Sequence, residues 1–187
     1  FRSACRGIPF ELGEPDVPNV ILLDREPVEI PVDVEGVHYL VFLHVAETQN
    51  EPIDPALAAQ PSPTGNPSGQ LVSEYTIQYS DGETHAHPIH RRFAIQQPVL
   101  DWGASAFAAV PSLDDEVFRS VADSLELGED AADGWGWGET RTRSGRDRGA
   151  DVLWLYALPN PHPEKPLRSI RLTPREEKSV VYAISVT

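Results

Sequence analysis

Two tryptophans separated by a single glycine are the residues of this sequence best suited to bind a ligand. Trp135 and Trp137 lie within residues 134–138, where the neighbouring glycines have no side chains that could bury the indoles. An exposed indole offers a flat apolar face against which the C–H groups of a sugar ring can stack. Arg141 follows closely and could donate hydrogen bonds to sugar hydroxyls. The alternative is that both rings fold back and close the edge of a core.

A second set of polar and aromatic residues could serve the same chemistry. Asp101 adjoins Trp102, so a carboxylate and a stacking ring stand together, although a core tryptophan beside a turn aspartate would give the same pattern. His44 and Glu47 lie at the exit of a long apolar run and could reach a site built on loops, because loops on a rigid scaffold commonly carry binding residues. A hydrogen-bonded histidine at the edge of the core is the alternative for His44.

Three closely spaced histidines, His85, His87 and His90, come nearest to a metal-binding cluster. His85 and His87 share one face of an expected strand, but Pro88 precedes His90 and no nearby acid completes a ligand set. A small metal-assisted hydrolase built on these histidines is therefore a weak alternative. The sequence also has no nucleophile elbow, zinc-protease motif or glycine-rich phosphate loop, so we assign no catalytic residue and expect a protein that is not an enzyme.

Charge and composition narrow the class of partner. Fifteen Lys and Arg residues stand against 29 Asp and Glu residues, which gives a formal net charge of −14. Such a charge repels nucleic acid and anionic membrane surfaces, and no run of about 18 apolar residues is present. A neutral ligand fits better. Cys5 is the single cysteine, so no internal disulfide can form.

Alternating apolar and polar residues predict an all-β chain. In residues 71–79, Leu71, Tyr75 and Ile77 are expected to face inward, and the Asp81-Gly82 pair predicts a tight hairpin turn. Residues 37–46 are apolar on both sides, which indicates a central strand. Strands are expected at residues 28–34, 37–46, 71–79, 84–95, 152–158, 167–173 and 179–186.

The rest of the chain predicts loops and one helix. Residues 47–70 are rich in proline and residues 128–150 in glycine and charge, so both are expected to be long surface loops. An amphipathic stripe behind Ser112 predicts a short helix near 113–127. A chain of 187 residues with 40% hydrophobic content suits one domain spanning 1–187, folded as an antiparallel β-sandwich or jelly roll. Since Phe1 cannot be a native start, we expect a piece of a longer protein.

Several segments together resemble the galactose-binding-like β-sandwiches, a jelly-roll class that includes accessory carbohydrate-binding modules of polysaccharide-active enzymes. The similar residues lie at 7–10, 39–46, 75–82, 99–102, 153–161 and 165–172, in order along the chain. The motifs are chiefly structural.

The resemblance implies a domain of a secreted or cell-surface enzyme. Such a domain would bind glycan through loops at one end of the sandwich or would only pack against the catalytic domain of its parent. Members of the class often carry a structural calcium ion, and the oxygen-rich loops here could hold one, although no spacing selects a site. The leading expectation is a non-catalytic module in which Trp102, Trp135 and Trp137 stack on sugar. Asp101, His44, Glu47 and Arg141 would bond its hydroxyls.

Overall fold

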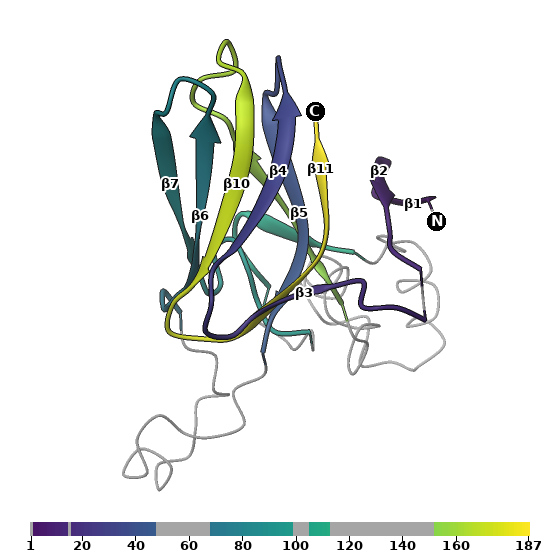
Figure 1. The fold of residues 1–187 in the computed structure, drawn as a ribbon. Helices are drawn as coiled ribbons and strands as arrows, with labels where there is room; N and C mark the ends of the chain where they lie inside the picture. Colours follow the sequence, from purple (N-terminus) through teal and green to yellow (C-terminus); the bar gives the residue numbers. More distant parts are fainter. Residues whose placement is uncertain (1, 15, 48–67, 99–104, 113–151) are drawn as a thin grey trace, which may run out of the picture.

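The protein folds into two antiparallel β-sheets packed face to face (Figure 1). The computed structural model describes residues 2–14, 16–47, 68–98, 105–112 and 152–187, and in this part of the chain all regular secondary structure is β-strand. The prediction of an all-β sandwich is confirmed. None of the described residues belongs to a helix that could span a membrane.

Each sheet is assembled from strands that are distant in sequence. The first sheet has the order β4-β10-β6-β7, and the second has the order β3-β11-β5-β9-β8. The bounds in the first sheet are Val28–Val34 (β4), Leu167–Pro174 (β10), Leu71–Tyr79 (β6) and Thr84–His90 (β7). Those in the second are Ile21–Leu23 (β3), Ser179–Val186 (β11), Tyr39–Ala46 (β5), Trp154–Pro159 (β9) and Ala109–Pro111 (β8). A separate hairpin pairs Arg2–Cys5 (β1) with Ile8–Glu11 (β2).

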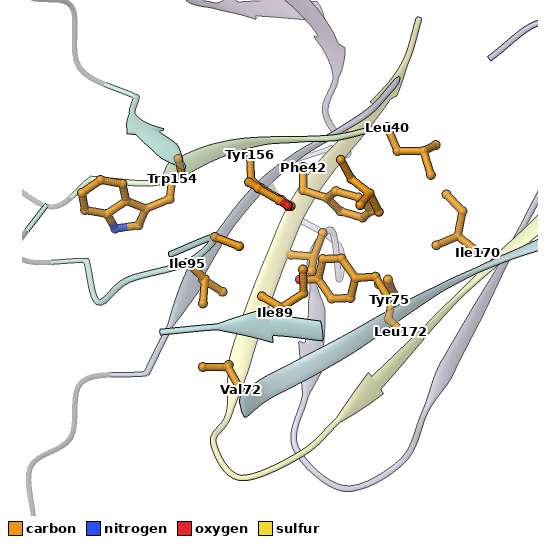
Figure 2. Packing of buried hydrophobic residues seen from close by; sticks show 14 of the residues in the cluster. Leu40, Phe42, Val72, Tyr75, Ile89, Ile95, Trp154, Tyr156, Ile170 and Leu172 are labelled. Carbon is orange, nitrogen blue, oxygen red and sulfur yellow. The ribbon is translucent and has the colours of Figure 1, made fainter. Parts of the chain in front are cut away.

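Strand β5 is central and buried on both faces, as its two apolar sides predict. Leu40 and Phe42 point into the core between the sheets, where the rings of Phe42 and Tyr75 lie 4.5 Å apart (Figure 2). Val41 and Leu43 point outward into a second apolar cluster, which Phe10 of β2 covers. The β1–β2 hairpin therefore seals the outer face of the five-stranded sheet beside β11 (Figure 1).

The predicted β6–β7 hairpin is confirmed, with an antiparallel register and a turn at Asp81 and Gly82. Gly82 has a φ of 91°, a conformation that glycine adopts without steric cost. The Asp81 carboxylate accepts a hydrogen bond from the Glu83 amide at 2.9 Å and pairs with Lys165 at 2.7 Å. The turn residues thus supply their own polar contacts at one end of the sandwich.

Two details of this hairpin differ from the sequence prediction. The register of β6 against β7 shifts between Leu71 and Ser73, so a β-bulge turns Val72 into the core in place of Leu71. Strand β7 also ends at His90 rather than near residue 95, because the chain turns sharply from Arg91 onward. The other predicted strands are confirmed to within two residues.

Both outer strands of the four-stranded sheet contain proline. Pro31 lies in β4 and Pro88 in β7, and these strands form the two edges of the sheet. Proline has no backbone N–H to offer a further strand, so both edges are poor templates for strand addition.

The predicted helix near 113–127 and the predicted loop at 128–150 fall outside the described residues, as does most of the loop predicted at 47–70.

The hairpin cover can be tested by truncating its main apolar contact. Phe10 is 3% exposed, and Phe10→Ala should destabilise the fold by about 3 kcal/mol, because it opens a cavity over Val41 and Leu43. Urea unfolding at neutral pH measures the loss. Phe107→Ala, at a site that is 70% exposed, is the matched control and should change stability by less than about 0.5 kcal/mol. Equal losses in both variants would contradict the role of the hairpin.

Candidate functional site

The predicted site residues Asp101, Trp102, Trp135, Trp137 and Arg141 lie outside the described residues, but the points where their segments join the sandwich are described. The Pro98 carbonyl accepts a hydrogen bond from the Val152 amide at 2.7 Å.

Ser112 and Leu153 meet through two further bonds. The Ser112 amide donates to the Leu153 carbonyl at 2.8 Å, and the Leu153 amide donates to the Ser112 hydroxyl at 3.0 Å. The described residues Pro98, Ser112, Val152 and Leu153, which adjoin the segments 99–104 and 113–151 in sequence, therefore lie close together at the start of β9. We call this end of the sandwich, where β5 and β7 finish and β9 begins, the loop end.

Glu47 is the one predicted site residue that the structure places on the surface. It follows β5 at the loop end and is exposed, while its backbone is held on both sides. Its amide donates to the Lys178 carbonyl at 2.9 Å, and its carbonyl accepts from Nη2 of Arg91 at 2.8 Å. The side chain of Glu47 is thus carried by a fixed backbone.

His44 was expected to bond a ligand hydroxyl, and the structure places it inside the core instead. Its side chain is fully buried between the sheets. Nε2 lies 3.0 Å from the Ala94 carbonyl oxygen and Nδ1 lies 2.9 Å from the Tyr75 hydroxyl. Because both ring nitrogens are engaged and no atom is accessible, His44 cannot contact a surface ligand. The expected role is wrong for the reason that makes β5 central: its residues face apolar layers on both sides.

The hydrogen bonds of His44 define its protonation state. A carbonyl oxygen only accepts, so Nε2 carries the proton that bonds to Ala94, and Nδ1 accepts from the Tyr75 hydroxyl. Burial lowers the pKa of His44 from 6.5 to about 4, and the bond to Ala94 offsets this only in part. His44 is therefore a neutral imidazole at pH 7.

Ala94 belongs to a sharp turn at residues 91–95, and this turn contributes one ring to an exposed aromatic pair that the sequence did not suggest. Phe93 is 47% exposed, and Phe107, from the segment before β8, is 70% exposed. Their ring centroids lie 5.5 Å apart, with an angle of 52° between the planes. The guanidinium carbon of Arg92 lies 5.4 Å from the centre of the Phe107 ring. We call Phe93, Phe107 and Arg92 the aromatic platform.

Backbone hydrogen bonds hold the two halves of the platform together. The Phe107 amide donates to the Arg92 carbonyl at 2.8 Å, and the Ala108 amide donates to the Phe93 carbonyl at 2.9 Å. Arg92 has a φ of 65°, a left-handed conformation that is rare outside glycine and asparagine. Such local strain persists only where surrounding contacts enforce it. The platform is therefore set by the fold rather than by the flexible reach of its side chains.

A buried arginine anchors the turn from below. Arg91 is 1% exposed, and its Nε and Nη2 lie 2.7 Å and 2.5 Å from Oε2 of Glu177, in the connection between β10 and β11. Its Nη1 donates to Gln96 at 3.1 Å, and its Nη2 also reaches the carbonyl of Glu47. All three guanidinium nitrogens thus have partners, which a buried cation requires.

The sequence did not predict that Phe93 is exposed, because the alternation of β7 assigns residue 93 to the core face of the sheet. His85, His87 and Ile89 face the core on β7, and continuing the same period would bury residue 93 as well. The turn that starts at Arg91 breaks this period and directs Phe93 outward. The one available signal is the Arg91-Arg92 pair, since two arginines are an unusual start for the buried half of a strand.

Within the described residues, the three histidines of β7 do not come together as a metal-binding group. Nε2 of His87 lies 2.7 Å from the Tyr156 hydroxyl between the sheets, and Nδ1 of His90 lies 3.0 Å from the Gly69 carbonyl. Burial, followed by the nearby His85 and His90, lowers the pKa of His87. Across the residues placed by the structure, no group of three metal-binding side chains converges. The geometry gives no support to the metal-hydrolase alternative.

The two other prominent surfaces differ in character from the loop end. At the opposite end, Lys165 pairs with Asp81 and Glu83, and His162 lies 3.3 Å from Glu83. The four strands of the first sheet contain only two Phe, Tyr or Trp residues, Tyr75 and Tyr79, and both are buried. Exposed aromatic rings fixed side by side are therefore a feature of the loop end.

Comparison with known proteins adds no relative: no family model, curated protein or solved structure matches this chain. The chemistry of the site rests on its own geometry.

The contribution of Arg91 to the unfolding free energy can be measured by replacing its charged side chain. Arg91→Met leaves the carboxylate of Glu177, whose side chain is 8% exposed, without its buried partner, so the loss in unfolding free energy should be about 3–5 kcal/mol. Adding Glu177→Leu should recover part of this loss, because the carboxylate that faced Arg91 is removed as well.

Urea unfolding of the two single variants and the double variant gives the coupling energy. Strictly additive losses would contradict a direct Arg91–Glu177 interaction.

Proposed function

We propose that this chain is a non-catalytic domain that binds neutral carbohydrate at the loop end of a galactose-binding-like sandwich. The observation that carries the proposal is the aromatic platform, in which Phe93 and Phe107 are exposed and held 5.5 Å apart by backbone hydrogen bonds. Rings fixed before binding lose little conformational entropy when a sugar stacks on them.

The size of the platform favours a small ligand over a protein. The exposed fractions of Phe93 and Phe107 correspond to about 230 Å² of exposed surface, taking about 200 Å² for each residue. A stable protein–protein interface buries about 800 Å² on each partner. A sugar ring that stacks on two aromatic rings is closer to the area that the platform offers.

Charge supports a neutral ligand. With a formal net charge of −14, the chain repels polyanions such as nucleic acids and sulfated or phosphorylated polymers. Neutral sugars are recognised by ring stacking and by hydrogen bonds to hydroxyls, which do not depend on net charge. Glu47 stands exposed at the same end and is a candidate for the second kind of contact.

The tryptophans predicted from the sequence extend this proposal. Trp102, Trp135 and Trp137, with Asp101 and Arg141, belong to segments that join the sandwich at the loop end, through Pro98–Val152 and Ser112–Leu153. We assign them to the same binding end as the platform and drop His44 from the set. From the resemblance we further propose that the domain belongs to a secreted or cell-surface, polysaccharide-active enzyme and that its loops could hold a structural calcium ion.

A second candidate is an accessory domain that packs against the catalytic domain of its parent enzyme. It is favoured by the phenyl rings themselves, which lack the polar atom that Trp or Tyr would offer a sugar. Val110 of β8 is 45% exposed and adds further apolar surface to this part of the molecule. This candidate predicts no glycan binding by the isolated chain.

Glycan binding separates the two candidates. The purified chain is applied to an array of neutral glycans and polysaccharides, and each hit is titrated by tryptophan fluorescence with and without calcium. Phe93→Ala and Phe107→Ala should each weaken binding by about tenfold, which corresponds to about 1.4 kcal/mol of lost stacking. Trp135→Ala and Trp137→Ala are tested in parallel.

Tyr39→Ala is the matched control, because Tyr39 has the same 47% exposure as Phe93 but lies at the opposite end of β5. It should leave the affinity unchanged. Silence across the array would favour the accessory domain, and binding that survives both Phe substitutions would remove the platform from the site.

A further inference from the structure

His44 connects the centre of the core to the aromatic platform by a single hydrogen bond. Its Nε2–H donates to the carbonyl of Ala94, the residue that follows Phe93 in the 91–95 turn. We infer that His44 is the positioning residue of the platform and makes it sensitive to acid: the neutral imidazole holds the turn closed, and the protonated imidazole favours its opening. The inference concerns regulation of the binding site proposed above and rests on that proposed function for its biological meaning.

Protonation would upset both contacts of His44. The imidazolium can still donate to Ala94. In the neutral state, however, Nδ1 accepts a hydrogen bond from the Tyr75 hydroxyl, and after protonation Nδ1 is itself a donor that faces this hydroxyl. The buried hydroxyl of Tyr75 would have to reverse its hydrogen bond. A new charge would also be buried without a counter-ion, which costs far more free energy than a neutral polar group.

The described groups that face His44 do not offset the free-energy cost of charging its ring. Tyr75 on β6 and Tyr156 on β9 are the titratable groups that face it, with ring centroids 5.9 Å and 6.2 Å away. His87 on β7 lies behind Tyr156 and would itself become cationic in acid. In the 91–95 turn, Arg91 is positive and its carboxylate partner Glu177 is already engaged. No charged group in the described part of the chain stabilises a charge on His44.

The direction of the pH effect follows from the closed and open states. In the closed turn the pKa of His44 is about 4, and in an open, hydrated turn it returns toward 6.5. Between these values the open state binds the proton and the closed state does not. The closed turn is therefore fully favoured above pH 6.5 and loses stability as the pH falls toward 4.

Opening of the turn would dismantle the platform. Phe93 and Ala94 both donate their amides to the His90 carbonyl at 3.1 Å, and the Phe93 carbonyl holds Ala108. If Ala94 leaves His44, these bonds lose their fixed geometry, and Phe93 separates from Phe107. A glycan held on both rings at neutral pH would then be released in acid.

Amide hydrogen exchange tests this coupling without any ligand. Exchange of a peptide spanning residues 91–97 is followed by mass spectrometry at pH 7.5 and pH 5.5, both above the sequence pI of about 4.7, in the full chain and in His44→Gln. Glutamine can donate to Ala94 and accept from Tyr75 but does not titrate. Relative to the variant, the wild-type peptide should lose about tenfold in protection at pH 5.5, one unit below the open-state pKa, and nothing at pH 7.5.

If His44→Gln does not fold, hydrogen exchange of the wild-type chain alone can test the inference. The protection of the 91–97 peptide is then compared with that of a peptide from β10, because intrinsic exchange changes with pH equally in both. A selective loss in the turn supports the inference, and a constant ratio between pH 7.5 and 5.5 overturns it.

Glycan titration of the same proteins keeps the two proposals separate. With a bound glycan, the wild type should weaken in acid more than His44→Gln. Selective opening without glycan binding at any pH would retain the inference and reject the proposed function. Binding that is independent of pH, together with constant protection, would do the reverse.

Discussion

Strand β5 has to be covered on both faces, and most of the molecule is arranged around that requirement. Its inward residues meet the four-stranded sheet, and its outward residues meet Phe10 of the β1–β2 hairpin. A strand with mostly apolar residues on both faces cannot lie at a solvated face without a large loss of hydrophobic free energy. The β1–β2 hairpin near the start of the chain and strands β9 and β11 near its end therefore all pack against or pair with β5.

Burial of β5 forces polar groups to find partners inside the protein, and these partners shape the surface. His44 needs an acceptor for Nε2–H, and the 91–95 turn supplies the Ala94 carbonyl. The same turn buries Arg91 against Glu177. Because unsatisfied buried polar atoms are costly, these contacts favour one conformation of the turn at neutral pH. The position of the exposed aromatic platform thus follows from the hydrogen bonds that the buried side chains of His44 and Arg91 make with the turn and its surroundings.

The longer strands could be predicted from the sequence, either from a clear alternation, as in β4 and β6, or from a long apolar run, as in β5. The sequence did not predict β1, β2, β3 and β8, which have only three or four residues each. The bulge at Val72 and the end of β7 at His90 could not be predicted either, since both depend on contacts with distant strands and loops. The same limit applies to the site. His44 and Phe93 have identities that suit either side of a sheet, and only tertiary contacts decide that the histidine is buried and the phenylalanine exposed. Glu47 directly follows the apolar strand β5 and is exposed, and its role in a site stays a prediction.

The prolines at both edges of the four-stranded sheet matter for a domain that binds a polymeric ligand, as proposed here. A polymer with repeated binding sites gathers many copies of a domain at a local concentration far above that in solution. Crowded β-sheet proteins with open edges tend to join edge to edge and aggregate. Pro31 and Pro88 close two edges, and the other sheet ends in β3 and β8, strands of three residues each. Under the proposed function, these edges would limit edge-to-edge association between copies crowded on one polysaccharide.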